Sequence, residues 1–169
     1  MKKSVIFISV MAIMLLGLCG CGKNNSEGNM DIQLNNIDEY RNDSVDDIEI
    51  NNISIELDKW DEDEVYVNLL INITNKFDFD CSTVGVLLKL IDENNNVIEK
   101  TNATINNIAS GKSGNATVTL ADYADFEKTK TIEIYYYGAW TKKDKKIVEV
   151  EGGFSEKQLF DINDISVKE

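Results

Sequence analysis

Apolar and polar residues alternate with a period of two through most of the chain beyond about residue 45. The clearest run covers residues 65–74, where every odd position is Val, Leu or Ile and most even positions are polar. Alternation of this kind is typical of a β-strand with one buried face. The apolar positions change parity at Asn51–Asn52, which predicts a bulge or a bend at that point.

The same period predicts further strands, separated by short turns. Beside the run at 65–74 they cover residues 48–50, 53–57, 84–91, 97–102, 116–120, 132–140 and 147–150. Asp92–Asn96 is expected to be a hairpin turn, because Asn and Asp tolerate left-handed backbone. We expect a loop with one helical turn at 123–126, and Ser155–Gln158 resembles a helix capping box.

About seven short strands with frequent turns indicate an all-β chain. The spacing favours a single Ig-like antiparallel β-sandwich. Residues 45–169 are enough for one core, and no second domain is expected there. The fold is expected to follow an N-terminal signal helix and a disordered tether.

The N-terminus has the layout of an export signal. Lys2 and Lys3 give a cationic start, residues 5–16 are apolar, and small residues follow. The apolar run is shorter than the about 20 residues of a permanent transmembrane helix. We therefore expect residues 1–20 to be a signal peptide.

The end of this signal resembles a bacterial lipobox, with Leu18 three residues before Cys21 and Gly20 directly before it. The resemblance implies cleavage before Cys21 and a diacylglyceryl lipid on its thiol. Two acyl chains hold a protein to a bilayer far more firmly than one. The expected location is the extracytoplasmic side of the cell membrane, with an ordinary cleaved signal or an uncleaved anchor as the alternatives.

Residues 21–44 are expected to form the lipidated N-terminus and a flexible linker. This segment is rich in Asn, Asp, Glu, Ser and Gly, with few apolar residues, and such a composition cannot bury a core. A coil of this length reaches roughly 25 Å on average. The linker would hold the folded domain away from the membrane surface.

Charge and composition exclude several functions. The chain has 30 acidic and 17 basic residues and a net charge of −13, so nucleic acid would be repelled. It contains no histidine, the commonest general base and zinc ligand, and no nucleophile elbow or phosphate loop. We therefore expect that the protein is not an enzyme. Cys81 would be the only cysteine of the mature domain apart from Cys21, and it is expected to be a core residue.

Two surface features are candidate binding sites. Tyr136 shares parity with the apolar residues of its strand and is expected to face the core, so Tyr135 and Tyr137 would face outward and could contact a protein or a sugar. Exposed aromatic residues are also common on strands without binding anything. The acidic loop with Asp58, Asp61 and Asp63 could hold Ca²⁺ weakly through oxygen ligands, although a solvated turn explains it as well. No other cofactor is expected.

Three segments resemble FxLYD domains: Leu88–Asp92 is similar to the signature itself, Asn72–Asn75 to the end of the preceding strand, and Ile108–Lys112 to a characteristic turn. Phe, Tyr and Pro of the family pattern are Leu88, Ile91 and Ser110 in this chain. The resemblance covers roughly residues 50–138. It implies an Ig-like domain of the kind found in lipoproteins of Gram-positive bacteria, with no established catalytic residues.

The sequence thus predicts a lipoprotein that carries a non-catalytic binding module for a protein or a cell-wall glycan. The alternative is an accessory or structural subunit of a cell-envelope complex. A third hypothesis is a cation-dependent sensor or scaffold, which would be stabilised by Ca²⁺ through Asp58–Glu64. The expected partners are the membrane, through the lipid, and a protein or the cell wall.

Overall fold

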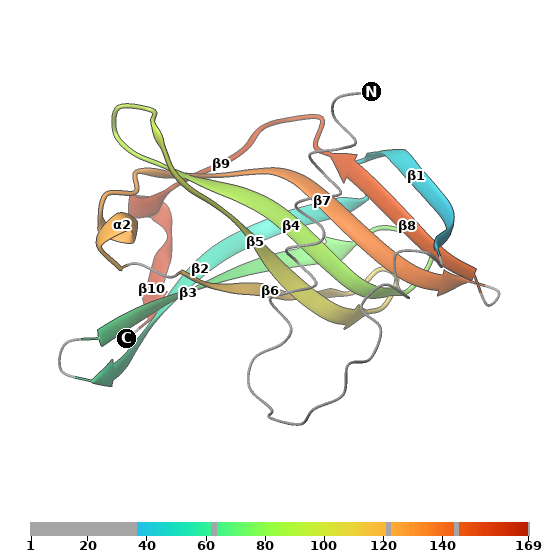
Figure 1. Cartoon of the computed structure of the whole chain (residues 1–169), viewed down its shortest axis with the longest axis horizontal. Coiled ribbons are helices and arrows are strands. Elements are labelled where there is room, and N and C mark those ends of the chain that lie inside the picture. The colour runs from blue at the N-terminus through green and yellow to red at the C-terminus, as the bar shows by residue number, and fades with distance from the viewer. Residues whose placement is uncertain (1–36, 62–63, 121–122, 144–145, 169) are drawn as a thin grey trace, which may run out of the picture. The chain divides into compact units, whose positions relative to one another are not determined.

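The computed structural model describes residues 37–61, 64–120, 123–143 and 146–168, which belong to one folded unit (Figure 1). The expected signal peptide, Cys21 and the first part of the expected linker lie outside the described residues. None of the helices within the described ranges has the length and apolar character needed to cross a bilayer.

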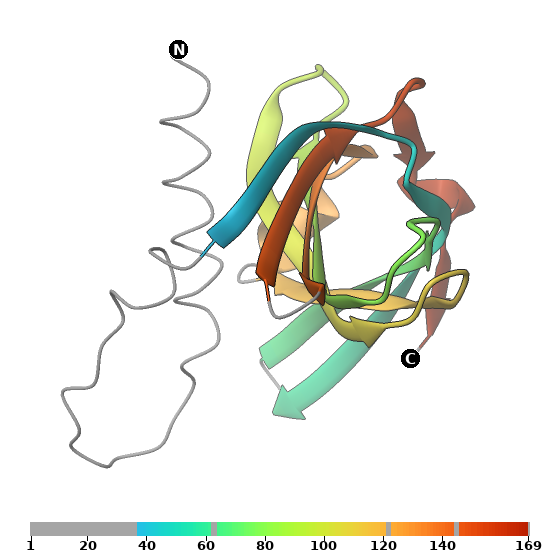
Figure 2. The same cartoon turned by 90° about the vertical axis from the view of Figure 1, so that its right-hand side faces the viewer.

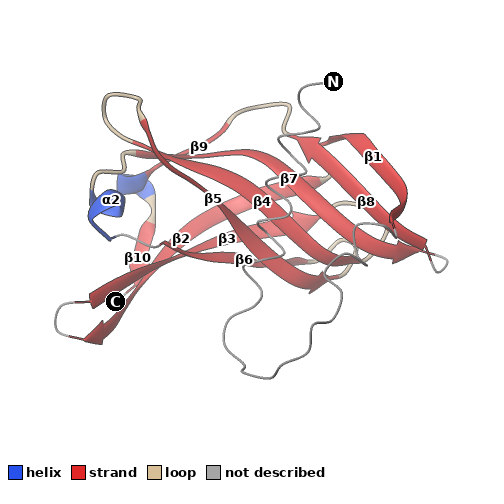
Figure 3. Ribbon diagram, in the orientation of Figure 1, coloured by secondary structure: helices blue, strands red, loops and turns tan. Residues whose placement is uncertain are grey.

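Strands make up most of the unit, with only two short helical segments (Figure 3). The strands are β1 (Ile37–Val45), β2 (Ile48–Asp61), β3 (Glu64–Asn75), β4 (Cys81–Ile91), β5 (Val97–Ile108), β6 (Ser113–Leu120), β7 (Thr131–Lys143), β8 (Lys146–Gly153), β9 (Gln158–Asp161) and β10 (Ser166–Lys168). The helical segments are α2 (Tyr123–Glu127) and a 3-10 turn at Ile162–Asp164. The prediction of an all-β chain is confirmed.

All ten strands belong to one sheet, in the order β1-β8-β7-β4-β5-β6-β3-β2-β10, with β9 paired to the start of β7. One residue pair, Thr104 with Thr117, joins β5 to β6. The sheet curls at this weak junction, so that β8, β7 and β4 face β2 and β3 across the interior (Figure 2). We call these two halves the β7 wall and the β3 wall.

The architecture differs from the expected seven-strand antiparallel sandwich. The described residues form ten strands, and β1 pairs in parallel with β8, as β10 does with β2. The additional strands are β1, β9 and β10. Strand β1 is mostly polar and forms one edge of the sheet, β10 is short and forms the other edge, and short β9 pairs with part of β7. Such strands need little apolar sequence, because they pair through the backbone and leave much of their surface in water.

Alternating residues build the core as the period predicted. The odd positions of β3 from Val67 to Ile73 are fully buried, and the register shift between Ile50 and Asn52 confirms the expected bulge in β2. The turn after β4 is also confirmed as a hairpin. There the Asp92 carboxylate accepts the backbone N–H groups of Asn94 and Asn96 at 2.9 and 2.7 Å.

One predicted boundary and one predicted helix start were wrong. Strand β1 begins at Ile37, inside the segment 21–44 that we expected to be a linker, because the composition of an edge strand is close to that of a linker. The capping-box segment starting at Ser155 forms a bend that leads into β9 instead of a helix. The Ser155 N–H donates to the Asp46 carboxylate at 3.0 Å, so this residue is tied to the corner between β1 and β2.

Asn75 fixes the loop between β3 and β4 (residues 76–80). Its buried side chain donates to the carbonyl oxygens of Phe79 and Ile108 at 3.0 and 3.1 Å and accepts the Phe77 N–H at 3.0 Å. The N–H of Gly111 donates to the Asn75 carbonyl at 2.8 Å. Two of the FxLYD-like segments, around Asn75 and Gly111, therefore meet at one end of the interior.

Candidate functional site

A bulge in β7 reverses the expected facing of its tyrosines. Leu87 of β4 pairs with Tyr136, whereas the next residue, Leu88, pairs with Ile134, so Tyr135 is an extra residue in β7. Ile134 faces the core before the bulge, and Tyr137 faces it afterwards. The prediction that Tyr137 points outward was wrong, because the parity rule fails across an inserted residue.

Tyr137 is a fully buried anchor. Its hydroxyl lies 2.6 Å from the Ser44 hydroxyl and accepts the Asp47 N–H at 3.1 Å. Its ring packs edge-on against Phe77 and Phe154, with centroids 6.4 and 5.3 Å away. Tyr137 thus ties the corner between β1 and β2 to the centre of the β7 wall and offers no surface to a partner.

Tyr135 is half-buried on the outer side of the β7 wall. The Lys89 ammonium lies 4.3 Å from the centre of its ring, and Lys89 also forms an ion pair with Glu133 at 3.0 Å. Cation–π contacts of this kind hold a ring in place. Of the two tyrosines expected to form a binding face, only Tyr135 is therefore available at the surface.

The main aromatic group of the outer surface lies beside Tyr135, where β7, β8 and β1 run side by side. Register places Glu149 next to both Trp140 and Tyr40, and Glu151 next to Gly138. Tyr136, one strand position before Tyr137, lies on the same outer side. We call Tyr40, Tyr136, Trp140, Glu149 and Glu151 the aromatic–acidic cluster.

Hydrogen bonds organise this cluster. The hydroxyl groups of Tyr40 and Tyr136 both donate to the Glu151 carboxylate, the latter at 3.2 Å. The Trp140 side chain forms a hydrogen bond to Glu149. These contacts join side chains of β1, β7 and β8, which are neighbouring strands of one sheet. The cluster therefore has a defined geometry.

Both carboxylates of the cluster are buried, with Glu149 7% and Glu151 4% exposed. Burial and the neighbouring charge of Glu151 raise the pKa of Glu149 from 4.5 to about 6, against a lowering effect of the Trp140 hydrogen bond. Burial also raises the pKa of Glu151, while the Tyr40 and Tyr136 hydroxyls lower it. Burial raises the pKa of Tyr136 to about 12. The cluster concentrates negative charge beside aromatic rings, and Tyr40 is 51% exposed.

The outer surface of the β3 wall has a different character. Asn51 donates to Asn72 at 2.8 Å, and Asn72 donates to Asn115 at the same distance across β3 and β6. Thr74 and Ser113 continue this polar ladder with hydroxyls 2.7 Å apart. These groups satisfy one another in a solvated sheet surface.

The sequence predicted that Asp58, Asp61 and Asp63 could bind Ca²⁺ weakly. Asp58 is exposed near the end of β2, opposite Tyr66. The side chain of Asp61 and the whole of Asp63 lie outside the described residues. No group of three or more His, Cys, Asp or Glu residues that could hold a metal occurs among the residues that are described, and calcium binding by this loop stays a prediction.

Cys81 opens β4 and is 1% exposed, as expected for a core residue. Burial, and after it the charge of Asp80, raises the pKa of its thiol to about 12. The thiolate is the nucleophilic form of cysteine, so this residue is inert at neutral pH.

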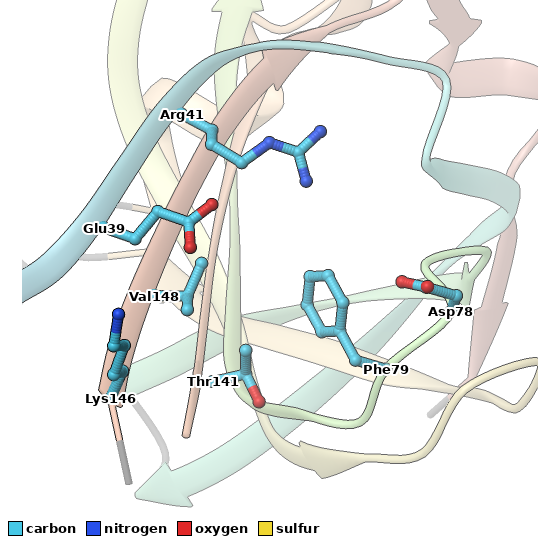
Figure 4. A pocket seen from close by; sticks show the side chains of 7 residues that line it. All are labelled: Glu39, Arg41, Asp78, Phe79, Thr141, Lys146 and Val148. Atoms are coloured by element: carbon cyan, nitrogen blue, oxygen red, sulfur yellow. The ribbon is translucent and has the colours of Figure 1, made fainter. Parts of the chain in front are cut away.

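A second candidate site is a pocket of about 320 Å³ next to β1, with charged side chains around it (Figure 4). Glu39 and Arg41 of β1, Asp78 and Phe79 of the 76–80 loop and Lys146 of β8 line it. Sequence patterns could not find this pocket, because its residues come from β1, the 76–80 loop, β7 and β8, and β1 was not predicted as a strand.

Comparison with known proteins leaves the family of the chain open. No family model matches the sequence, and no curated protein matches it. A structure described as the structural characterization of IrmA from Escherichia coli superposes with a TM-score of 0.41 at 13% identity, over 62% of this chain and 92% of that one. This similarity is too distant to support a conclusion about fold family or function.

Proposed function

We propose that the chain is a membrane-anchored extracytoplasmic lipoprotein whose folded unit is a non-catalytic module that binds a protein or a glycan. The lipobox-like sequence before Cys21 supports the anchor, and the FxLYD-like segments support an extracytoplasmic binding domain. The observation that carries the binding function is the aromatic–acidic cluster on the outer side of the β7 wall. It is a fixed group of three aromatic rings around two buried carboxylates.

The cluster has the chemistry of a recognition surface. Aromatic rings give a large contact area with little loss of conformational entropy, and they stack on side chains and on the apolar faces of sugars. The raised pKa values of Glu149 and Glu151 mean that their ionised forms are poorly solvated. A ligand that brings a positive charge or donates hydrogen bonds would stabilise these ionised forms.

Charge favours a protein partner with basic residues over a neutral glycan. The net charge of −13 attracts a basic surface over a distance and would accelerate its association. Lysine or arginine side chains could then contact the exposed ring of Tyr40, where they would lie close to the buried negative charges of Glu149 and Glu151. A glycan would gain the stacking but not the long-range attraction.

In-cell crosslinking followed by mass spectrometry tests the proposal. The full-length chain should capture a specific envelope protein, and Tyr40→Ala and Trp140→Ala should reduce the capture at least about fivefold, as expected for loss of an interface aromatic residue. Tyr66→Ala is the matched control, because Tyr66 is 38% exposed on the β3 wall. Capture that is equal in all variants would place the binding surface elsewhere.

The same experiment separates the two functional hypotheses. One abundant partner in a fixed ratio to the chain would favour the accessory-subunit alternative. If only wall fragments are captured, and the cluster variants reduce that capture, the ligand is a glycan. The binding function is then retained while the basic protein partner is excluded.

The anchor has an independent test. Metabolic labelling with a fatty-acid analogue should mark the wild-type chain, and Cys21→Ala should abolish the label. A chain that still incorporates the analogue after this substitution would contradict lipidation at Cys21.

A further inference from the structure

The pocket next to β1 is separate from the aromatic–acidic cluster, although the same strand serves both. Side chains alternate along β1, so Tyr40 points to the outer cluster while Glu39 and Arg41 point to the interior side, next to Val148 and Val150 in the register. Figure 4 shows the Arg41 guanidinium extending into the hollow from β1, with Phe79 and Asp78 on the opposite side.

One wall of this pocket, the 76–80 loop, is held in place by hydrogen bonds. Asn75 holds the Phe79 carbonyl at 3.0 Å, and the Ser110 N–H donates to the Asp80 carboxylate at 2.9 Å. The Thr141 hydroxyl donates to the Asp80 carbonyl. Phe79 stacks on buried Phe77, with ring centroids 4.7 Å apart. The 76–80 loop is therefore pre-organised, which lowers the entropy cost of binding.

Arg41 is the single arginine of the chain, which otherwise uses lysine for its positive charges. Arginine recognises a carboxylate through two parallel hydrogen bonds, a geometry that lysine does not offer. Its ion pair with Asp43 runs from Nε at 3.7 Å, longer than a charge-assisted hydrogen bond. The terminal nitrogens face the hollow in Figure 4.

The four charged side chains that line the pocket balance, and Asp43, the ion-pair partner of Arg41, is not among the lining residues. Arg41 and Lys146 are positive, and Glu39 and Asp78 are negative. A purely anionic ligand would be repelled by the two carboxylates and by the acidic chain as a whole. A ligand that carries one charge of each sign meets an opposite charge at both ends and has no net charge to be repelled.

We propose that this pocket binds a small zwitterion, such as a free amino acid or a short peptide, with its carboxylate on Arg41 and its ammonium group on Asp78 or Glu39. The Phe79 ring covers the apolar part of the ligand. The volume of about 320 Å³ lies at the small end of the range for ligand pockets. This function is independent of the partner that binds the outer cluster.

Thermal unfolding of the full-length chain in detergent tests the proposal with L-leucine as the probe. A ligand that binds only the folded state raises the midpoint as its concentration increases. N-acetyl-L-leucine lacks the ammonium group and L-leucinamide lacks the carboxylate, so neither should raise the midpoint as L-leucine does. Leucyl-leucine distinguishes the sources: a larger shift than with L-leucine identifies a peptide ligand, and a smaller one a free amino acid.

Variants locate the site. Arg41→Met and Asp78→Asn should each weaken the apparent affinity at least about tenfold, the loss expected for a charge-assisted contact. Lys100→Met, on the exposed surface of β5, should leave the affinity unchanged. Asp78 is exposed in a loop, so Asp78→Asn is expected to fold. It therefore still tests the site if Arg41→Met proves to be unfolded. The proposal is overturned if neither L-leucine nor leucyl-leucine raises the midpoint. It is also overturned if N-acetyl-L-leucine and L-leucinamide raise the midpoint as much as L-leucine does, or if Arg41→Met and Asp78→Asn bind L-leucine as tightly as Lys100→Met.

Discussion

Glu149 should make the protein more stable in mild acid than at neutral pH. Its pKa is raised from 4.5 to about 6 in the folded chain, so the folded state holds this proton more tightly than the unfolded state does. Stability therefore increases as the pH falls through about 6, and the increase is complete below 4.5. This is the opposite of the usual carboxylate effect, in which a partner lowers the pKa and acid destabilises the fold.

The magnitude follows from the difference between the two pKa values. A change from 4.5 to about 6 corresponds to about 2 kcal/mol when the protonation is complete. Between pH 7.5 and pH 5 the proton is bound mostly in the folded state, and the linkage relation gives a gain of about 1 kcal/mol. The pKa of Glu151 is also raised by burial, so this residue changes the stability in the same direction as Glu149. The pKa values of Asp46, Asp92 and Asp161 are lowered from 3.8, so these residues affect stability in more acidic solution.

Urea unfolding at the two pH values measures the effect. Wild type should be about 1 kcal/mol more stable at pH 5 than at pH 7.5. Glu149→Gln should remove at least half of this difference and raise the stability at pH 7.5. Glu156→Gln, at an exposed carboxylate, is the control and should keep the wild-type profile. An unchanged pH profile in Glu149→Gln would refute the reasoning, because the buried carboxylate would then not be the titrating group.

Three further predictions concern the backbone and the core. Gly152→Ala should destabilise the fold by about 1–3 kcal/mol in urea unfolding, because the new Cβ would lie 2.2 Å from the Ser44 carbonyl oxygen, whereas Gly153→Ala, with nothing within 4 Å, should be neutral. Equal stability of the two variants would contradict this packing. Asn75→Ala should cost about 3 kcal/mol in the same assay, since three hydrogen bonds are lost inside the fold, and a loss below about 1 kcal/mol would argue against its role. Cys81 should not react with iodoacetamide at pH 8 until the chain is unfolded, as measured by mass spectrometry. Rapid labelling of the native chain would contradict its burial in the core.

The sequence predicted the core strands well because their burial follows a simple period. Every odd position of residues 65–74 is Val, Leu or Ile, and the structure buries those from Val67 to Ile73. The turn at Asp92–Asn96 was equally predictable, since its hydrogen bonds are local. The switch at Asn51–Asn52 could be found because apolar residues continue on both sides of it.

The candidate site was harder to predict, because it depends on register and on non-local pairing. The bulge at Tyr135 lies within three consecutive tyrosines, where composition gives no sign of a change in parity. Glu149 and Glu151 belong to a strand that the period did predict, but their burial depends on Tyr40 of β1. That strand has one apolar residue at its start and one at its end, so its docking on β8 has no signal in the local sequence.

The two edges of the sheet have a consequence for how the chain folds. Ile37 pairs with Ile147 at one edge and Ser54 with Ser166 at the other, in each case about 110 residues away along the chain. Closing such long loops costs entropy before any pairing rewards it, which slows folding to the millisecond-to-second range of β-rich domains. The sheet cannot be completed before β8 and β10, close to the C-terminal end of the described residues, have joined it. The two parallel edge pairings are therefore expected to form last, after the antiparallel strands between them have paired.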